Sequence, residues 1–297
     1  MSRFLYSLLF PAFLIASPVH AASIGKNNEL VWAGCGITKH AFMTELAKAY
    51  EKKSGIKINL QGGGATRGIR DAVKGEINIG GACRTAIDTI EEERGAYQIP
   101  VAWDALVVIV HSSNPVDSIT FDQLKGIYLG KIKNWKELGG PDRPLELYIR
   151  QGKLSGVGRT LRELVFANFE QEFHGKYVEK STGPLEKGVE ENRNGIAVTG
   201  VSSAKRRKVK ILQLEGHAPT YDNIKSGHYM LYRPLYLVAQ KRQISDPRVK
   251  EFITFVLSDE GREIIRKMGT VPYADAMSLV MKQVEQYERA AKRGLYN

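Results

Sequence analysis

Cysteine and histidine are scarce in this chain of 297 residues, which contains two Cys and six His. A structural zinc site takes about four such ligands at close spacing, and no pair of His accompanies the two Cys. His40, His111 and His174 lie in separate segments without a catalytic motif, so Cys83 has no partner that would mark a nucleophile and its base. We therefore expect no metal site, no cofactor and no enzymatic activity.

Hydrophobic runs long enough to span a membrane are also absent. The chain starts with a positive charge, residues 4–16 are mostly apolar, and the small residues Val19 and Ala21 precede a cleavage point at Ala22. This pattern predicts a secretory signal peptide over residues 1–21, with a retained membrane anchor as the alternative. No Cys follows the cleavage point to carry a lipid, so we expect a soluble mature chain in the periplasm, an oxidising compartment.

Acidic residues are outnumbered, with 32 Asp and Glu against 43 Lys and Arg and a net charge of +11. The composition, 43% hydrophobic and 25% charged, is typical of a globular protein, and the length suits two domains. A basic surface favours anionic partners. The densest basic run, residues 204–208, is short and isolated, so we expect a solvated loop there and no nucleic-acid partner.

Glycine, by contrast, is concentrated in three turns at residues 33–38, 62–68 and 155–160. Each turn lies between a predicted strand and a predicted helix, and this repetition predicts a parallel α/β sheet with its ligand beyond the carboxyl ends of the strands. The strands are expected at residues 30–32, 56–60, 77–79, 101–110, 145–150, 195–198 and 235–239. The helices are expected at residues 41–53, 69–74, 121–129, 161–169, 247–257, 260–268 and 276–293, the last with Met277, Met281 and Val284 on one apolar side.

The start of a helix presents unpaired backbone N–H groups and a partial positive charge, which together bind anions. Glycine lets the backbone approach an anion closely, because no side chain is in the way. Three turns of this kind predict a protein that encloses a small oxyanion.

The order and spacing of these motifs resemble the phosphate-binding proteins of ABC importers, a branch of the periplasmic solute-binding proteins. The resemblance covers nearly all of the chain after residue 21. It implies an α/β fold of the type II periplasmic binding class, two-lobed, with a ligand cleft between lobes joined by two crossover strands. Lobe one is expected at residues 24–107 and 236–297, and lobe two at residues 108–235. The matching segments are Ala33-Gly34-Cys35-Gly36, residues 58–64, residues 78–84, Arg150 with Ser155-Gly156, residues 194–198 and residues 232–236.

The resemblance also implies which residues hold the anion. Arg150 would donate hydrogen bonds to two oxygens of the anion, with a surface salt bridge as the alternative. Ser155 would donate its hydroxyl, with an ordinary helix cap as the alternative. Arg84 would be a second cation on the ligand or the partner of a local carboxylate. The full set is Cys35, Gly36, Ile37, Thr38, Gly64, Ala65, Thr66, Cys83 and Arg84 from lobe one, and Arg150, Ser155, Gly156, Val157 and Gly158 from lobe two.

The chain departs from the family pattern at several of these positions. Cys35 stands where relatives carry a hydroxyl, Cys83 where they carry serine or aspartate, and Ala65 and Val157 also replace hydroxyl residues. Three extra residues, 152–154, lengthen the third loop. The carboxylate that would select a protonated oxyanion by accepting its proton is missing from these positions. Phosphate is therefore the default ligand, and the two thiols favour a related anion.

Cys35 and Cys83 fall at the carboxyl ends of two strands that we expect to be neighbours. Three interpretations stay open: a disulfide, a thiol that meets a thiophilic oxyanion such as arsenate or arsenite, and an inert buried pair. We expect a monomeric solute-binding protein that captures phosphate or a phosphate-like anion such as arsenate and delivers it to a membrane permease. The alternative is a sensor for a thiophilic oxyanion that uses Cys83 and signals to a histidine kinase.

Overall fold

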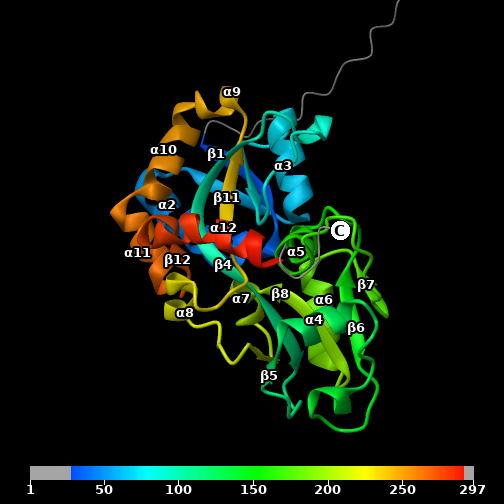
Figure 1. The fold of residues 1–297 in the computed structure, drawn as a ribbon. Helices are drawn as coiled ribbons and strands as arrows, with labels where there is room; N and C mark the ends of the chain where they lie inside the picture. The colour runs from blue at the N-terminus through cyan, green and yellow to red at the C-terminus, as the bar shows by residue number, and fades with distance from the viewer. Residues whose placement is uncertain (1–27, 291–297) are drawn as a thin grey trace, which may run out of the picture.

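The computed structural model describes residues 28–290, so the signal peptide expected at residues 1–21 lies outside the described part. The centre of the molecule is a ten-stranded sheet in the order β2-β1-β3-β11-β4-β8-β6-β7, with β12 and β9 added along β4. Figure 1 shows this sheet running through an upper and a lower half, each with its own helices. Among the described helices, none is both long and apolar enough to cross a bilayer.

The strand β4 (Tyr97–His111) joins the two halves because it changes partner along its length. It pairs antiparallel with β11 (Tyr232–Ala239) up to Ala105, and with β8 (Gly195–Gly200) from Leu106 onward. Every residue at positions 101–110 is buried, as expected for a strand that is covered on both faces. The strand predicted over these residues is confirmed and extends further at its start.

The upper half in Figure 1 is a parallel α/β unit, in which β2, β1 and β3 run in the same direction. The helices α2 and α3 end at Gly55 (φ 73°) and Gly75 (φ 79°), where a left-handed conformation stops each helix without steric cost. The elements are β1 (Glu29–Gly34), α1 (Gly36–Thr38), the π-helix η1 (Lys39–Met43), α2 (Thr44–Ser54), β2 (Lys57–Gln61), α3 (Gly64–Lys74), β3 (Ile79–Ala82), η2 (Glu91–Glu93), α9 (Lys241–Ile244), α10 (Pro247–Leu257), α11 (Asp259–Lys267), β12 (Val271–Pro272) and η5 (Tyr273–Ala276).

The lower half contains the parallel strands β8, β6 and β7 and a small two-stranded sheet of β5 and β10. Its helix α4 begins with a capping box, in which Thr120 and Gln123 satisfy each other's backbone N–H groups. The elements are β5 (Ser118–Ile119), α4 (Phe121–Tyr128), η3 (Trp135–Leu138), β6 (Glu146–Arg150), α5 (Gly156–Leu161), the π-helix η4 (Arg162–Phe166), β7 (Tyr177–Glu179), α6 (Thr182–Glu191), α7 (Val201–Ala204), β9 (Val209–Ile211), β10 (Gln213–Leu214) and α8 (Tyr221–Ser226).

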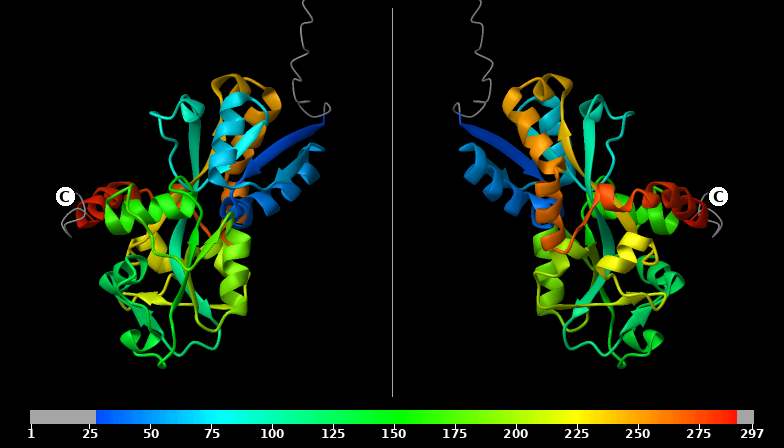
Figure 2. Two further views of the ribbon diagram at one scale, coloured as in Figure 1. Left: turned by 90° about the vertical axis from the view of Figure 1, so that its right-hand side faces the viewer. Right: turned by 90° about the vertical axis from the view of Figure 1, so that its left-hand side faces the viewer.

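The helix α12 (Ser278–Ala290) lies on one side of the molecule, at the level where the two halves meet, as Figures 1 and 2 show. Its Gln286 amide is buried and donates to the carbonyls of Met230 (2.7 Å) and Tyr232 (3.0 Å). The apolar side predicted for this helix faces solvent instead, since Met281 is 74% exposed and Val284 is 55% exposed. The predicted helix is confirmed, and the side that carries Gln286 is packed.

The structure changes two details of the predicted elements. The helix expected at residues 69–74 already begins at Gly64, so the second glycine turn forms its first turn. The helix expected at residues 161–169 is divided into α5, which begins at Gly156, and η4, which ends at Phe166 before Ala167 (φ 47°). The lobe boundaries at residues 107/108 and 235/236 stay a prediction.

Candidate anion-binding site

The three glycine-rich turns meet where the two halves of the sheet join. Each follows a strand and opens a helix: α1 after β1, α3 after β2 and α5 after β6. Figure 1 shows α5 of the lower half next to α3 of the upper half. A Cβ added to Gly156 would lie 2.3 Å from the Cys83 sulfur and 3.2 Å from the Ala65 Cβ. The backbone of the third turn therefore lies against side chains that follow β3 and β2.

Hydrogen bonds also connect the two halves at this place. The Thr66 hydroxyl donates to the Leu154 carbonyl at 3.1 Å, and Arg84 Nε donates to the same carbonyl at 2.9 Å. In the other direction, the Thr160 hydroxyl donates to the Cys83 carbonyl at 3.4 Å. The extra loop residues 152–154 thus contribute an acceptor that holds the halves together.

Side-chain caps occupy one amide in two of the three turns. Cys35 Sγ accepts a hydrogen bond from the Thr38 N–H at 3.4 Å, and Ser155 Oγ accepts one from the Gly158 N–H at 3.2 Å. Ser155 therefore caps its helix by accepting a hydrogen bond, which does not use its hydroxyl proton, so its predicted donation to a ligand stays a prediction. The Thr38 and Gly158 amides are already engaged. The first amides of a helix lack an intrahelical acceptor. Those of α1 and α5 belong to Gly36, Ile37, Gly156 and Val157.

The second turn has no side-chain cap on its helix. Gly63 (φ 132°) and Gly64 (φ 88°) adopt backbone conformations that other residues rarely reach, so glycine is required there. The amides of Gly64, Ala65 and Thr66 are the first of α3 and lack intrahelical acceptors. This turn therefore offers three donors of the kind that hold an anion.

The two cysteines are buried free thiols, so the possible disulfide between Cys35 and Cys83 is not formed in this structure. Burial raises the pKa of the Cys35 thiol well above its usual range, and the bond to Cys83 raises it further. The hydrogen bond from Cys35 lowers the pKa of Cys83 to about 6, and Arg233 and Arg150 contribute, although burial and Asp104 oppose them. Cys83 is thus the more acidic thiol of the pair.

Arg150, at the end of β6, has only neutral hydrogen-bond partners. Its Nε donates to the Glu179 carbonyl (3.3 Å), one terminal nitrogen to the Thr182 hydroxyl (2.9 Å) and the other to the Lys180 carbonyl (2.8 Å). These bonds use three of the five N–H groups of a guanidinium, which leaves one on each terminal nitrogen. No carboxylate of the described residues forms a salt bridge with it, so the alternative interpretation as a surface salt bridge is wrong. Burial lowers the pKa of Arg150, and the charges of Cys83 and Cys35 oppose this shift.

Arg233 and Asp104 form a second buried charge pair that sequence reasoning missed. They lie opposite each other on β11 and β4, with 3.6 Å between Arg233 Nη2 and Asp104 Oδ2. Arg233 Nη1 donates to the carbonyls of Cys83 (3.0 Å) and Gly156 (3.2 Å), whereas its Nε and Nη2 have no hydrogen-bond partner. A buried guanidinium with unused donors is costly, and it indicates a site for an acceptor.

Asp104 brings a carboxylate to the first turn, where none was expected. Its Oδ1 accepts from the Ser202 amide (3.1 Å) and hydroxyl (2.6 Å), while Oδ2 has no hydrogen-bond partner. A Cβ on Gly200 would lie 2.6 Å from this Oδ2 and 2.8 Å from an Ile37 methyl, so the three residues are neighbours. Burial raises the pKa of Asp104, against the charge of Arg233. A charged residue within an apolar strand was the signal that could have found it.

Arg84 forms a buried ion pair, which decides between its two predicted roles. Its two terminal nitrogens each lie 2.7 Å from an oxygen of Glu93, and both side chains are almost fully buried. The remaining N–H groups donate to the Thr85 and Leu154 carbonyls and the Thr66 hydroxyl. All five donors are therefore engaged within the protein. Arg84 is the partner of a local carboxylate and has no donor left for a ligand.

The structure divides the predicted site residues into two groups. It brings the amide donors of the three turns together with Cys35, Cys83, Arg150 and the Ser155 hydroxyl. It engages the Thr38 and Gly158 amides and the Arg84 side chain in internal hydrogen bonds. Arg233 and Asp104, which were not predicted, join the first group. Within the described residues no three His, Cys, Asp or Glu side chains are grouped as a metal site.

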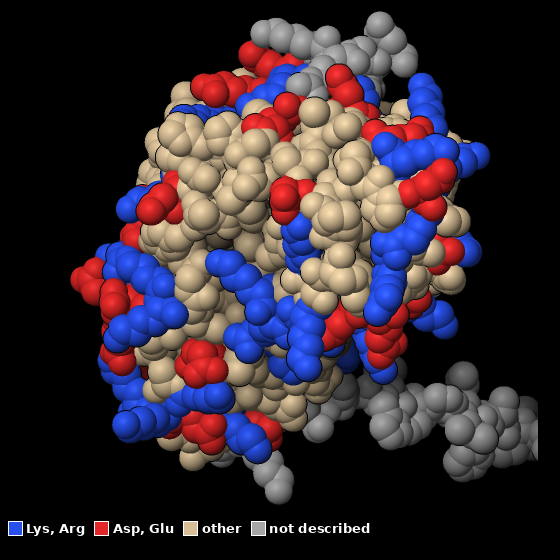
Figure 3. Space-filling model, turned by 90° about the horizontal axis from the view of Figure 1, so that it is seen from below, with Lys and Arg blue, Asp and Glu red and all other residues tan. Residues whose placement is uncertain are grey.

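The basic cluster at residues 204–208 is partly engaged as well. Arg207 lies 3.3 Å from a carboxylate oxygen of Glu186, and Arg206 donates to the His40 carbonyl at 3.4 Å. Seen from below, Figure 3 shows Lys and Arg covering more of the surface than Asp and Glu. Such a surface attracts anions of any kind by its long-range field, without selecting one.

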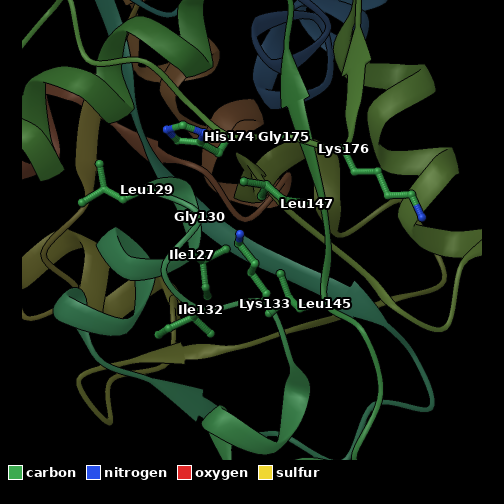
Figure 4. A pocket seen from close by; sticks show the side chains of 10 residues that line it. All are labelled: Ile127, Leu129, Gly130, Ile132, Lys133, Leu145, Leu147, His174, Gly175 and Lys176. Carbon is green, nitrogen blue, oxygen red and sulfur yellow. The ribbon is translucent and has the colours of Figure 1, made fainter.

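A separate cavity of about 500 Å³ lies in the lower half, away from the glycine turns. Figure 4 shows Lys133 pointing toward its centre, and Lys176 turned away from it, where Lys176 pairs with Glu146. Its lining combines aliphatic side chains such as Ile127 and Leu147 with polar ones such as His174. Lys133 is the one cation directed into it among the lining residues shown, so the cavity lacks the convergent donors of the turns.

Comparison with known proteins identifies the family. A profile of the PBP superfamily domain matches residues 32–260. The chain is 27% identical over 256 residues to the phosphate-binding protein PstS of Borreliella burgdorferi, covering 82% of this chain and 90% of that protein. It is 30% identical over 227 residues to PstS of Staphylococcus epidermidis, covering 69% of this chain and 67% of that protein.

A solved structure extends the similarity to the fold. A substrate-binding protein of Clostridium perfringens with bound phosphate matches with a TM-score of 0.74 and 29% identity, over 82% of this chain and 99% of the other. The mixed α/β fold with two lobes is therefore confirmed. The matched relatives are binding proteins, in agreement with the expectation that the chain is not an enzyme.

Proposed function

The chain belongs to the PBP superfamily, and we propose that it is a periplasmic solute-binding protein that captures a small tetrahedral oxyanion between two lobes. Lobe one would comprise residues 24–107 and 236–297, and lobe two residues 108–235. The ligand would be phosphate or a phosphate-like anion such as arsenate. The phosphate-binding relatives and the phosphate-bound structure of similar fold support this ligand class.

The observation that carries the proposal is the set of unused donors on two arginines beside the helix starts. Arg150 keeps one N–H on each terminal nitrogen, and Arg233 has three without a partner. A small oxyanion accepts hydrogen bonds on every oxygen, and charge-assisted bonds from guanidinium groups are among the strongest in proteins. Arg150 ends β6, and Arg233 lies on β11 opposite Asp104 of β4, the strand that joins the two halves, so an anion held by both would lie at that junction.

The turns would complete the coordination of the anion. The amides that lack an intrahelical acceptor would donate to the remaining oxygens: Gly36, Ile37, Gly64, Ala65, Thr66, Gly156 and Val157. The free Oδ2 of Asp104 would accept the proton of a protonated oxyanion. Phosphate and arsenate carry such a proton near neutral pH and sulfate does not, so we expect discrimination against sulfate.

A second candidate function rests on the buried free thiols of Cys35 and Cys83. A thiol pair binds trivalent arsenic, so the site would serve a sensor of arsenite or another thiophilic oxyanion that signals to a histidine kinase. The first candidate requires a membrane permease as partner instead. A neighbouring gene for one or the other would separate the two roles, and we propose that the protein is a monomer in both.

Calorimetry of the purified mature protein with phosphate, arsenate, sulfate, molybdate and arsenite tests both candidates. The first predicts tight one-to-one binding of phosphate or arsenate and weak binding of sulfate. The second predicts tight binding of arsenite that Cys83→Ser abolishes. Absence of heat with all five anions would contradict both.

A further inference from the structure

The Cys83 sulfur occupies the place where positive charge converges. Its neighbours are the thiol of Cys35, the guanidinium groups of Arg150 and Arg233, and the backbone of Gly156. The two arginines are the same groups that would hold an oxyanion. A thiol beside guanidinium groups ionises readily, and its thiolate would compete with the ligand for the same donors.

We propose that Cys35 and Cys83 form a reversible dithiol–disulfide site, whose oxidation ties the Cys83 sulfur to the first turn, removes its thiol from beside Arg233 and Gly156 and so increases the affinity for the oxyanion. This inference rests on the proposed function of the same site. It adds a covalent state of the protein that changes ligand affinity.

The positions of the two cysteines suit a disulfide. Cys35 follows β1 and Cys83 follows β3, and these strands are paired in parallel with Gly34 opposite Gly81. By this register Cys35 is level with Ala82, and Cys83 lies one residue further along the neighbouring strand. A strand spacing of about 4.8 Å and a rise of about 3.3 Å give a diagonal of about 6 Å, within the range of Cα separations that a disulfide bridges.

The chemical step is an exchange with a disulfide compound, such as the active-site disulfide of a thiol oxidoreductase. The Cys83 thiolate attacks one sulfur of that compound, which releases one thiolate and leaves a mixed disulfide on Cys83. The Cys35 thiol gives its proton to the released thiolate and attacks Cys83 Sγ, which expels the second thiolate. Two electrons pass from the cysteine pair to the compound, and a dithiol reductant reverses the exchange.

Access to the pair depends on the closure of the two halves. Cys35 and Cys83 are 4% and 1% exposed, and Gly156 lies directly on the Cys83 sulfur. Exchange therefore requires the halves to separate. An anion that holds the halves closed should slow the exchange, so ligand occupancy and thiol reactivity are linked reciprocally.

The test compares one protein in two redox states. Wild-type protein is fully reduced with dithiothreitol or oxidised with oxidised glutathione, the S–S bond is verified by non-reducing peptide mapping, and phosphate is titrated by calorimetry. Removal of a charge this close to two arginines should tighten binding about tenfold or more in the oxidised state. Reduction should restore the weaker value, and saturating phosphate should slow modification of Cys83 by a disulfide reagent.

Two variants serve as matched controls. Cys83→Ser has no thiolate, so its phosphate affinity should match the oxidised wild type and ignore the redox treatment. Cys35→Ser keeps the Cys83 sulfur without its partner, so oxidised glutathione stops at a mixed disulfide on Cys83, whose bulk should weaken phosphate binding instead of tightening it. Equal or weaker phosphate binding by the oxidised wild type, or absence of the disulfide-linked Cys35–Cys83 peptide, would overturn the proposal. Both measurements use wild-type protein, so they decide the question even if a variant fails to fold. Absence of phosphate binding in both states would instead contradict the proposed function.

Discussion

Replacement of Arg150 by alanine should remove most of the affinity for the oxyanion and little of the stability. The free N–H groups on its two terminal nitrogens would form two charge-assisted hydrogen bonds to the ligand. At about 1.5–3 kcal/mol each, their loss weakens binding by at least about 3 kcal/mol, or roughly 100-fold. Calorimetry with phosphate measures this change directly.

The stability cost of the same variant follows from the bonds that Arg150 makes within the protein. It loses hydrogen bonds to two carbonyls and the Thr182 hydroxyl, which are neutral and partly accessible to water. We expect a loss of about 1–2 kcal/mol and a decrease of several degrees in Tm, measured by calorimetric unfolding.

Two controls separate this role from a general effect of charge. Arg150→Lys keeps the charge but loses the planar fork, so its affinity should lie between those of wild type and Arg150→Ala. Arg262→Ala removes one positive charge from α11, where Arg262 pairs with Asp259, and should leave affinity nearly unchanged. If Arg150→Ala binds phosphate as tightly as wild type, the assignment of this arginine to the site is refuted.

Three further changes test other parts of the site. Glu93→Gln should destabilise the protein by about 3–5 kcal/mol, since it leaves Arg84 buried without its partner. Arg84 outweighs burial and lowers the pKa of Glu93 in the folded state, so this difference in unfolding free energy should hold above the ordinary pKa of 4.5 and shrink as the pH falls below it. A difference that stays constant with pH would argue against the pair. Gly156→Ala forces a methyl group onto the Cys83 sulfur, so it should weaken phosphate binding at least about tenfold by holding the halves apart. Unchanged affinity would mean that the Cys83 side chain moves aside at little cost. The pKa of Cys83 is lowered to about 6 in the folded state from an ordinary 9.0. The unfolding free energy of the reduced wild type, measured relative to Cys83→Ser by denaturant unfolding, should therefore rise between pH 6 and pH 9, by at most about 1.4 kcal/mol per pH unit. A difference that does not change with pH would show that no thiolate is stabilised.

The strands and glycine turns could be predicted because they depend on local sequence. Alternation of apolar residues and the glycines after them predicted β1, β2 and β6 together with the helices that they lead into. The anion-binding character of the turns follows from backbone groups that every helix start shares. These features need no knowledge of which segments lie side by side.

The pairing of Arg233 with Asp104 could not be predicted, since it depends on the register between β11 and β4. Each residue alone is a single charge in an apolar strand, and only the pairing places both beside Cys83 and Ile37. The same reason applies to α12. Its periodicity predicts a helix, but the contacts of Gln286 with the segment before β11 decide which side is buried.

The most direct test of the account is a crystal structure of the protein with phosphate or arsenate at saturating concentration. The account predicts one anion at the junction of the three turns, within hydrogen-bond distance of Arg150, Arg233 and the amides of Gly36, Gly64 and Gly156. An anion bound only elsewhere, for instance beside Lys133 in the cavity of Figure 4, would contradict it.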